Sequence, residues 1–294
     1  MEETIRLEKV QKAFGRRDAL ARLDLSVQQG KVVGLLGLNG SGKTTTMRVI
    51  AGLSRPDSGR ARVFGTDPWN FTRAERRRIG YMTERDYPFR EQTLDEAIAL
   101  VDALHGGIDH RYVEHLKELL HVRGDIHYTA FSRGNQRRFH LIVTLAHQPE
   151  LLLLDDPAQG LDVEVRHDLV KGLLPLLERG KTTVLFSSHA FNDVERLAED
   201  VVIVHQGRVV FQAALDELEG RARQVLVRPG TALDCGRIVR RHAGERDERC
   251  TLVDVDPERL GELKRAGTVL DDRGLTLEEL FLEFVQRRRE ALSS

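Results

Sequence analysis

The chain has little of what marks a secreted, disulfide-stabilised or membrane-embedded protein. Its 294 residues contain two cysteines, Cys235 and Cys250, whose spacing fits no metal site. The N-terminal residues 1–4 lack the features of a signal peptide, so we expect no disulfide. No apolar run approaches the length of a membrane-spanning helix. These absences predict a cytoplasmic protein that reaches a membrane only through a partner.

Aromatic residues and net charge are scarce as well. Phe, Trp and Tyr make up 5% of the chain, and the formal net charge is −1. Because there is no global basic field, we expect no nucleic-acid partner and no general attraction to an anionic bilayer. An apolar content of 40% is sufficient for a hydrophobic core. The length predicts two domains, or one large domain with an appendage.

One glycine-rich stretch organises the rest of the chain. Residues 37–45 read GLNGSGKTT, follow the apolar run Val32–Leu36 and precede the helix-like run Thr46–Ala51. Strand, glycine loop and helix form the context in which G-x-x-x-x-G-K-[ST] binds phosphate. The glycines let backbone N–H groups point at an anion, and the helix adds the positive end of its dipole. The sequence therefore predicts a nucleoside triphosphate site.

The residues expected to bind the nucleotide at this loop are Gly37, Leu38, Asn39, Gly40, Ser41, Gly42, Lys43, Thr44 and Thr45. Lys43 is expected to reach the β- and γ-phosphates, and the Thr44 hydroxyl to ligate Mg²⁺. Phe14, one of few aromatic residues, is either a core or turn residue or a platform on which a purine stacks.

The elements before residue 150 change in character along the chain. Residues 4–10 alternate apolar and polar positions, as an edge strand would. The run of arginines in 73–78 is typical of a solvated helix face. Residues 93–148 show helical periodicity, beginning with a capping box formed by Thr93 and Glu96. We predict that about 91–148 form a helical subdomain inserted into an α/β core.

Two later runs predict buried parallel strands that end in polar residues. Leu151–Leu154 leads into Asp155 and Asp156, and residues 182–186 lead into His189. Open α/β sheets bind ligands at the carboxyl ends of such strands. Residues 201–211 read as a hairpin that closes the sheet.

The C-terminal part carries fewer chemical signals. Strands are expected at 225–227 and 251–253, helical stretches near 231–243 and 257–266, and a final helix from Thr276, boxed with Glu279. The predicted fold is α/β, a P-loop NTPase core with a parallel sheet, an antiparallel N-terminal β part and a small C-terminal α+β appendage. We expect an ATPase domain at 1–220 and an accessory region at 221–294.

Further motifs follow the glycine loop in a fixed order. They are Glu84 after a strand, the octapeptide FSRGNQRR at 131–138, DDP at 155–157, GLD at 160–162, and His189. Together with the loop they resemble the ATP-binding subunit of an ABC transporter over about residues 4–215. The resemblance implies ATP and Mg²⁺ as cofactors and ATP hydrolysis as the activity.

The resemblance also implies roles within one subunit. Asp155 corresponds to the carboxylate that holds Mg²⁺ through water, and Glu84 to a catalytic residue that can offer Mg²⁺ a further oxygen. Asp156 takes the place of the general base, and His189 that of the histidine that contacts the γ-phosphate. Phe14 matches the aromatic residue that stacks on adenine.

Other roles cross between two subunits. Ser132, Arg133, Gly134 and Asn135 match the signature motif, which binds the γ-phosphate held by the opposite subunit, and Asp162 matches a loop that crosses the dimer interface. The resemblance implies a second ATPase subunit, a homodimer being the simplest arrangement. It also implies a separate transmembrane permease, which would hold the chain at the inner face of the cell membrane.

Three positions depart from the family pattern. Position 156 is Asp instead of Glu, position 84 is Glu instead of Gln, and the signature reads F-S-R-G-N instead of L-S-G-G-Q. The shorter Asp156 side chain loses about 1.5 Å of reach, so ATP binding is expected but efficient hydrolysis is not. Glu84, the S-R-G signature and the tail at 275–281 resemble ABC-2-type exporters. Two alternatives stay open: a soluble ABC-type ATPase acting on ribosomes or DNA, and a nucleotide-dependent switch with slow turnover.

Overall fold

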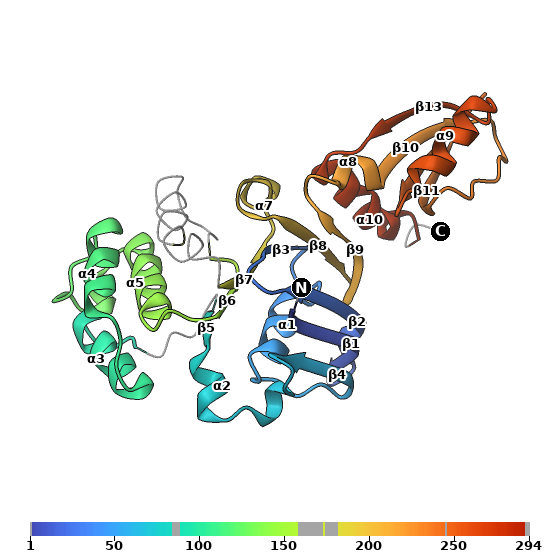
Figure 1. The fold of residues 1–294 in the computed structure, drawn as a ribbon. Coiled ribbons are helices and arrows are strands. Elements are labelled where there is room, and N and C mark those ends of the chain that lie inside the picture. Colours follow the sequence, from blue (N-terminus) through green and yellow to red (C-terminus); the bar gives the residue numbers. More distant parts are fainter. Residues whose placement is uncertain (1, 84–88, 158–172, 174–181, 245, 292–294) are drawn as a thin grey trace.

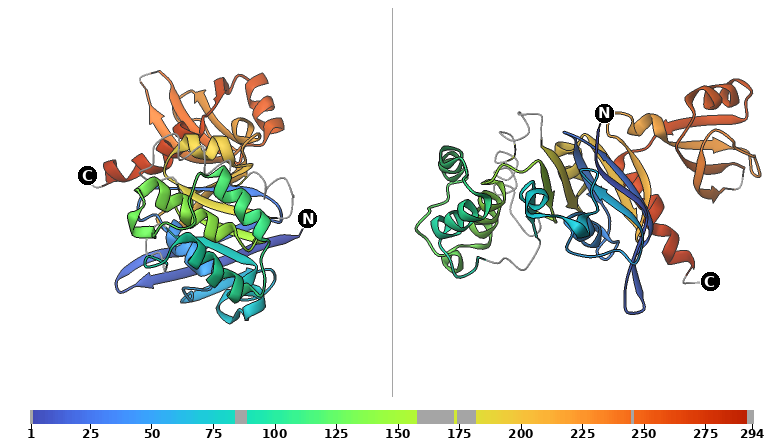
Figure 2. Two further views of the ribbon diagram at one scale, coloured as in Figure 1. Left: turned by 90° about the vertical axis from the view of Figure 1, so that its left-hand side faces the viewer. Right: turned by 60° about the horizontal axis from the view of Figure 1, so that its bottom comes forward.

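The computed structural model describes residues 2–83, 89–157, 173, 182–244 and 246–291, and the described strands form three sheets (Figure 1). The expected fold class is confirmed. Figure 2 shows from a second side that a block of helices lies at one end of the molecule and the C-terminal sheet at the other. The glycine loop and the residues that follow β6 and β7 lie between these two ends.

The first sheet is antiparallel and contains β2 (Arg17–Gln28), β1 (Glu3–Phe14) and β4 (Ser58–Val63) in that order. The prediction of an edge strand at residues 4–10 is therefore wrong, because β1 is the central strand. A central strand shows the same alternation when only one face of its sheet is buried. The inward side chains of β1, such as Leu7, join a core with the central sheet.

The second sheet is the centre of the molecule. Its strands, in spatial order, are β5 (Ile79–Met82), β6 (Leu151–Leu154), β7 (Thr183–Ser188), β3 (Val32–Leu36), β8 (Asp200–His205) and β9 (Arg208–Ala214). The β8–β9 pair is antiparallel, as the predicted hairpin requires, and the other neighbouring pairs are parallel. Because β6, β7 and β3 are adjacent and parallel, the segments that follow them meet at one edge.

Every residue of β3, β6 and β7 is buried, since apolar clusters cover both faces of the sheet. In β3 the side chains of Val33 and Leu35 join the cluster that includes the first sheet. Val32 and Leu36 join the opposite cluster, which includes the helical block. This two-sided burial explains why the strands read as continuous apolar runs.

The helical block between β5 and β6 contains α3 (Leu94–His105), α4 (His110–Leu119) and α5 (Arg133–Leu145). At the start of α3, Thr93 Oγ1 accepts from Glu96 N at 3.2 Å and the Glu96 side chain accepts from Thr93 N at 2.8 Å, so the predicted capping box is confirmed. Shorter segments elsewhere are η1 (Pro68–Asn70), α2 (Arg73–Arg77), η2 (Tyr128–Ala130), α7 (Phe191–Leu197) and α8 (Leu218–Arg221).

The third sheet lies in the C-terminal part and is antiparallel. Its spatial order is β11 (Arg237–Ala243), β12 (Glu248–Val253), β10 (Ala222–Val227) and β13 (Val269–Gly274), with α9 (Pro257–Arg265) packed beside it. The predicted helix near 231–243 is wrong, because β11 occupies its second half. Arginine-rich β11 is a strand because its backbone pairs with β12. The helix prediction used local propensity, which takes no account of such a partner strand.

The final helix, α10 (Leu277–Ala291), connects the C-terminal part to the central sheet. Its predicted capping box is present, with Glu279 N donating to Thr276 Oγ1 at 3.2 Å and Thr276 N to the Glu279 carboxylate at 3.0 Å. The Phe281 ring meets Phe191 of α7 edge to face, with ring centroids 5.2 Å apart. Since this contact joins the two parts, the domain boundary near residue 220 stays a prediction. Within the described residues, no helix is long and apolar enough to cross a membrane.

Candidate nucleotide site

The glycine loop joins β3 to α1 (Lys43–Ile50) as the sequence predicts. Gly40 and Gly42 adopt φ angles of 77° and 115°, in the region that residues with a side chain rarely occupy. A Cβ on Gly42 would lie 2.7 Å from the carbonyl oxygen of Ala19. Glycine is thus required at the residue that caps α1, and the first backbone N–H groups of α1 stay available to an anion.

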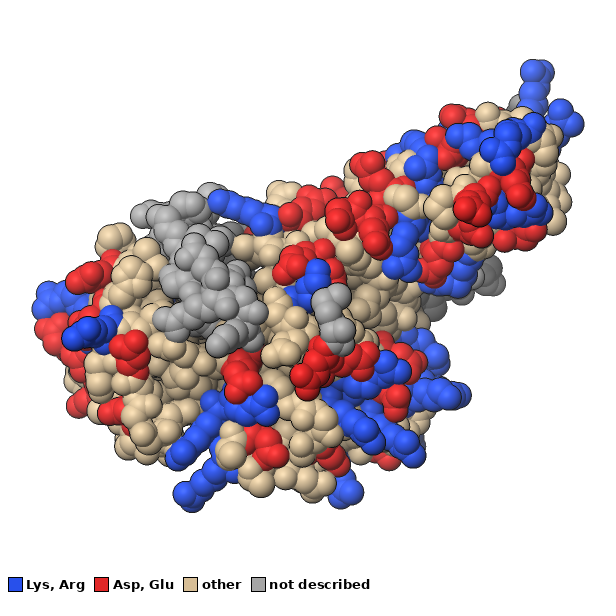
Figure 3. Space-filling view, in the orientation of Figure 1, with Lys and Arg blue, Asp and Glu red and all other residues tan. Residues whose placement is uncertain are grey.

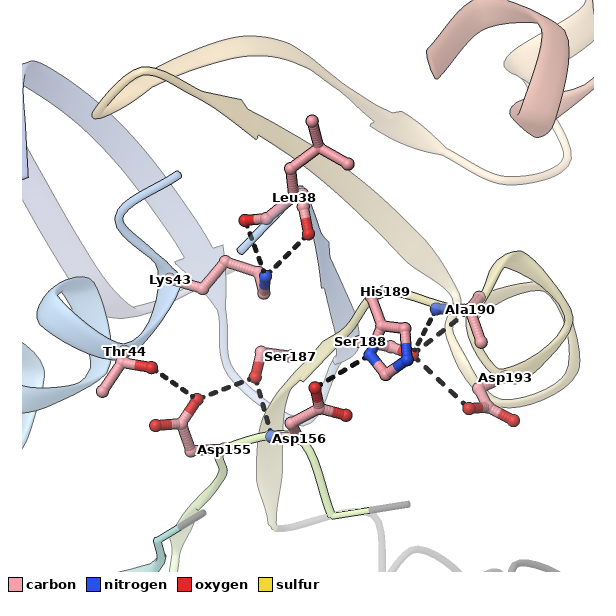
Figure 4. Close-up of polar contacts among 11 residues, drawn as sticks. Leu38, Lys43, Thr44, Asp155, Asp156, Ser187, Ser188, His189, Ala190 and Asp193 are labelled. Carbon is pink, nitrogen blue, oxygen red and sulfur yellow. Dashed lines mark hydrogen bonds and ion pairs between the residues drawn. The ribbon is translucent and has the colours of Figure 1, made fainter. Parts of the chain in front are cut away.

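Lys43 is the first residue of α1, and only 8% of its surface is exposed. Its Nζ donates to the carbonyl oxygens of Gly37 at 2.7 Å and Leu38 at 3.3 Å (Figure 4). The ammonium group is therefore held inside the curl of the loop. A buried cation at a helix N-terminus concentrates positive potential where phosphate would bind.

Thr44 and Asp155 bring the loop and β6 together. Thr44 Oγ1 donates to Asp155 Oδ1 at 3.1 Å, and Ser187 Oγ, at the end of β7, donates to the same oxygen at 2.9 Å. Ser187 Oγ in turn accepts from the backbone N–H of Asp156 at 2.8 Å. Ser187 thus fixes both carboxylate residues, a role that no sequence motif marks.

Asp156 and His189 form the second acidic contact. His189 Nδ1 lies 2.9 Å from Asp156 Oδ2 (Figure 4). Asp156 is 6% exposed and has φ 47°, a left-handed conformation that Asp adopts more readily than most residues. The structure therefore brings together two residues that lie 33 positions apart and that the sequence assigned to one catalytic site.

Tyr81 of β5 is a further neighbour of Asp155 that sequence reasoning did not select. Burial, together with the negative charge of Asp155, raises the pKa of the Tyr81 phenol well above its usual range. The phenol consequently remains neutral at any physiological pH and adds no second negative charge beside Asp155.

These residues line a cavity of about 500 Å³. Its lining consists of Phe14, Arg17, Ala19, Asn39, Gly40, Gly42, Lys43, Thr44, Thr45, Asp155, Asp156 and Ser187. Phe14 is 55% exposed and so presents a free ring to a ligand, with Lys12 Nζ 5.6 Å from its centroid. Its exposure excludes a core residue, and its place at the end of β1 is that of a turn residue, so stacking on a purine stays a prediction.

Arg17 is the second lining residue that sequence reasoning missed. A Cβ on Gly40 would lie 2.5 Å from Arg17 Nη2, so the guanidinium lies against the glycine loop. The β1–β2 hairpin brings it there by pairing Phe14 with Arg17. No motif marks this position, because its place depends on how the hairpin packs on the loop.

The four signature residues lie away from this cavity, at the start of α5. Ser132 is the N-cap of α5, and its Oγ accepts from Asn135 N at 3.3 Å. Ser132 and Arg133 are exposed, Gly134 and Asn135 half-buried, and none of the four lines the cavity. Glu84 and Asp162 lie outside the described residues.

The donor set fits a nucleotide with Mg²⁺. A threonine hydroxyl and a carboxylate converge at 3.1 Å, and hard oxygen ligands of this kind suit Mg²⁺. The glycine loop leaves no room for added Cβ atoms at Gly42, as a close phosphate cradle requires. In the part of the chain that the structure describes, no group of three or more His, Cys, Asp or Glu could hold a metal ion by itself. A site of this composition would need substrate phosphates to complete the coordination of Mg²⁺.

Known proteins share this arrangement. A family model described as ABC transporter matches residues 20–159. The Nod factor export ATP-binding protein I of Burkholderia lata is 31% identical over 295 residues, which cover 96% of this chain and 96% of that protein. The chain belongs to the ABC transporter family of ATP-binding subunits. It is therefore an ATP-binding ABC-type ATPase.

Two further comparisons agree. The sulfate/thiosulfate import ATP-binding protein CysA of Caulobacter vibrioides is 35% identical over 242 residues, 79% of this chain and 69% of that protein. A solved structure of the ATP-binding subunit of an ABC transporter has a TM-score of 0.67 and 26% identity, and covers 74% of this chain and 92% of that one. The family resemblance inferred from the motifs is confirmed.

Proposed function

We propose that the chain powers export by a separately encoded transmembrane permease, which holds it at the inner face of the cell membrane. The export relative aligns over 96% of this chain and so includes the C-terminal sheet. The import relative aligns over 79%. The alignment with this export relative, which extends over the C-terminal sheet, supports the export branch.

The proposed use of ATP rests mainly on one observation, the convergence of Lys43, Thr44 and Asp155 on one cavity. Lys43 and the N–H groups of the loop would bind the β- and γ-phosphates, and Arg17 would add a charge at Gly40. Thr44 and Asp155 would hold Mg²⁺, with Glu84 as a further ligand. When bound, Mg²⁺ neutralises charge that develops on the phosphates.

Asp156 is proposed as the general base for the attacking water. His189, 2.9 Å away, would hold the Asp156 carboxylate in place and reach toward the γ-phosphate. Ser187 is proposed as a positioning residue, because it bonds Asp155 and the Asp156 backbone together. Asp156 would then face the phosphates across the cavity, with its backbone held by Ser187 and its carboxylate by His189.

A second copy of the chain is proposed to complete the site. Ser132, Arg133, Gly134 and Asn135 begin a helix but lie outside their own chain's cavity, so they would serve the γ-phosphate held by the partner subunit. Asp162 is proposed to lie at the same interface. ATP would join two subunits, and its hydrolysis would release them.

A slower, switch-like function is favoured by one detail. The Asp156 carboxylate stands on a short side chain and is already engaged by His189. Nucleotide-dependent dimerisation with little turnover would fit that geometry, and the Asp156 variant described below separates the two functions.

The first test is affinity purification of the tagged chain from native membranes in mild detergent. Recovery of an integral membrane protein supports the transport subunit and indicates the cargo. Recovery with ribosomes or in free cytosolic fractions would refute it in favour of a soluble ABC-type ATPase.

The nucleotide site has its own test in Lys43→Ala. Loss of the ammonium group should weaken ATP binding in calorimetry by at least about a hundredfold, since charge-assisted phosphate contacts are strong. Unchanged affinity in a folded variant would refute the phosphate-loop assignment.

A further inference from the structure

Positive charge is unevenly distributed in this nearly neutral chain. The first eighty residues contain sixteen Lys and Arg but eight Asp and Glu, whereas the remainder contains 29 and 38. The excess is densest between residues 53 and 78, which contain seven arginines and three acidic residues. A net charge near −1 therefore conceals a strongly basic segment.

The three acidic residues of this segment accept hydrogen bonds from other groups of the chain. Asp57 accepts from Lys12 Nζ at 2.8 Å and Ala13 N at 2.7 Å. Asp67 accepts from Trp69 N at 3.0 Å, and Glu75 from Thr72 N at 2.7 Å. They cap turns and a helix and do not neutralise the neighbouring arginines.

One arginine of the segment is structural, and the other six are not. Arg78 bonds to both oxygens of Glu150 and stacks on the Phe64 ring at 3.7 Å. The six others are exposed and form no ion pair with any residue that the structure describes: Arg55, Arg60, Arg62, Arg73, Arg76 and Arg77. We call these six, with Leu53 and Trp69, the basic face.

The basic face lies on one side of the molecule. Arg55, Arg60 and Arg62 line one open hollow of about 570 Å³ along β4. β4, η1 and α2 lie on the same side in Figure 1, away from the C-terminal sheet. Figure 3 shows Lys and Arg side chains projecting from this lower edge of the molecule.

Two large apolar side chains are exposed among these charges. Leu53 is 58% exposed and Trp69, the one tryptophan of the chain, 46%. Their loops touch, since a Cβ on Gly52 would lie 2.2 Å from the carbonyl oxygen of Pro68. Tryptophan beside arginine is the composition of surfaces that lie at the headgroup level of a bilayer.

We propose that the basic face binds the headgroup layer of an anionic bilayer. The arginines would contact lipid phosphates, and Trp69 and Leu53 would enter the headgroup region. A bilayer fits better than a peptide because the charges are spread over β4 and α2, and the hollow along β4 is lined by Arg55, Arg60 and Arg62 and, among the residues that the structure describes, contains no large apolar side chain that would anchor a peptide. The inference rests on the proposed function, in which a permease brings the chain to the membrane.

Vesicle binding by the purified full chain tests this directly. The wild-type chain should co-sediment with vesicles of phosphatidylcholine and phosphatidylglycerol, bind pure phosphatidylcholine far less, and lose binding at high salt. Since Trp69 is the one tryptophan, its emission should shift to the blue on the anionic vesicles and be quenched by brominated lipid. Binding without a change in Trp69 emission would show that another face binds and would overturn the proposal.

A matched pair of triple variants locates the contact. Arg60→Gln with Arg73→Gln and Arg76→Gln should lower partitioning on the order of a hundredfold, about fivefold for each arginine. The control removes the same charge from exposed arginines of the C-terminal sheet, Arg228→Gln with Arg246→Gln and Arg249→Gln, and should change partitioning less than about twofold. Equal losses in both variants, or no vesicle binding by the wild type, would overturn the proposal.

These assays distinguish a failure of the nucleotide-site proposal from a failure of the lipid-contact proposal. Lys43→Ala should bind vesicles as the wild type does, because Lys43 is buried in the loop away from the basic face. The triple variant of the basic face should keep its ATP affinity in calorimetry. A vesicle assay that fails while Lys43-dependent ATP binding persists refutes the lipid contact alone.

Discussion

Asp156 Oδ2 lies 2.9 Å from His189 Nδ1, and the backbone of Asp156 is in turn anchored to Ser187. Contacts within the chain thus hold both the backbone and the carboxylate of Asp156, the proposed base. Its side chain is one methylene shorter than the glutamate usual in the family. Any effect of the lost reach would appear in the rate of hydrolysis.

Asp156→Glu is expected to raise the ATPase turnover number by up to about a hundredfold, because about 1 Å of misplacement at a reacting centre can cost that much. ATP affinity should be unchanged, since Lys43 and Thr44 are untouched. Steady-state kinetics and calorimetry measure the two quantities. A variant that still dimerises with ATP but turns over no faster would show that carboxylate reach is not limiting.

Ser187→Ala should destabilise the fold and slow hydrolysis together. It removes the acceptor of the buried Asp156 N–H and a donor to Asp155, which should lower the free energy of unfolding by about 1–3 kcal/mol in urea. Ser58→Ala is the control, because its hydroxyl is exposed and should matter by less than about 0.5 kcal/mol. Equal stability of the two variants would contradict the bridging role.

Arg17→Ala should weaken ATP binding about tenfold, the loss expected for one charge-assisted contact. Its neighbour Arg16 is exposed but does not line the cavity, so Arg16→Ala provides a control with the same loss of charge. Calorimetry with ATP compares the two. If both variants bind alike, the guanidinium beside Gly40 makes no contact with nucleotide.

The fold should lose stability in mild acid because of buried imidazoles. Burial lowers the pKa of His140 to about 3 and that of His147 to about 4, from an ordinary value of 6.5. The unfolded chain then binds more protons, so stability is full above about pH 6.5 and falls as the pH is lowered toward these values.

For His140 alone the expected loss between pH 7 and pH 5 is about 2 kcal/mol. His140→Phe can keep the stacking on Tyr128 but cannot bind a proton, so its unfolding free energy should depend less steeply on pH. Urea unfolding at the two pH values measures this, with the exposed His115→Gln as control. An unchanged slope for His140→Phe would indicate that His140 is not the group that titrates.

Much of the molecule could be predicted from local sequence patterns. The glycine loop, the fully apolar strands β3, β6 and β7 and the two capping boxes depend on residues close together in the chain. The acidic pair directly follows the apolar run of β6, and a ligand site there was predictable because open α/β sheets bind ligands at the carboxyl ends of their strands.

Only the tertiary structure determined the features that depend on distant pairing. β11 forms a strand because β12 lies beside it, although its arginines favour a helix by local propensity. β13 was missed, since it is a strand through its pairing with β10, more than forty residues earlier in the chain. The alternation of residues 4–10 could not show that β1 is the central strand, because that place depends on pairing with β2 and β4.

The site residues show the same division between what local sequence predicts and what tertiary structure decides. Lys43 and Thr44 could be selected from the glycine-loop motif, and Asp155, Asp156 and His189 from the resemblance to the ABC transporter family. Ser187 and Arg17 could not, since a hydroxyl or guanidinium acts where packing places it. The sequence by itself determined which residues can bind phosphate and metal. The packing of the strands and of the β1–β2 hairpin decided that Ser187 and Arg17 lie beside them.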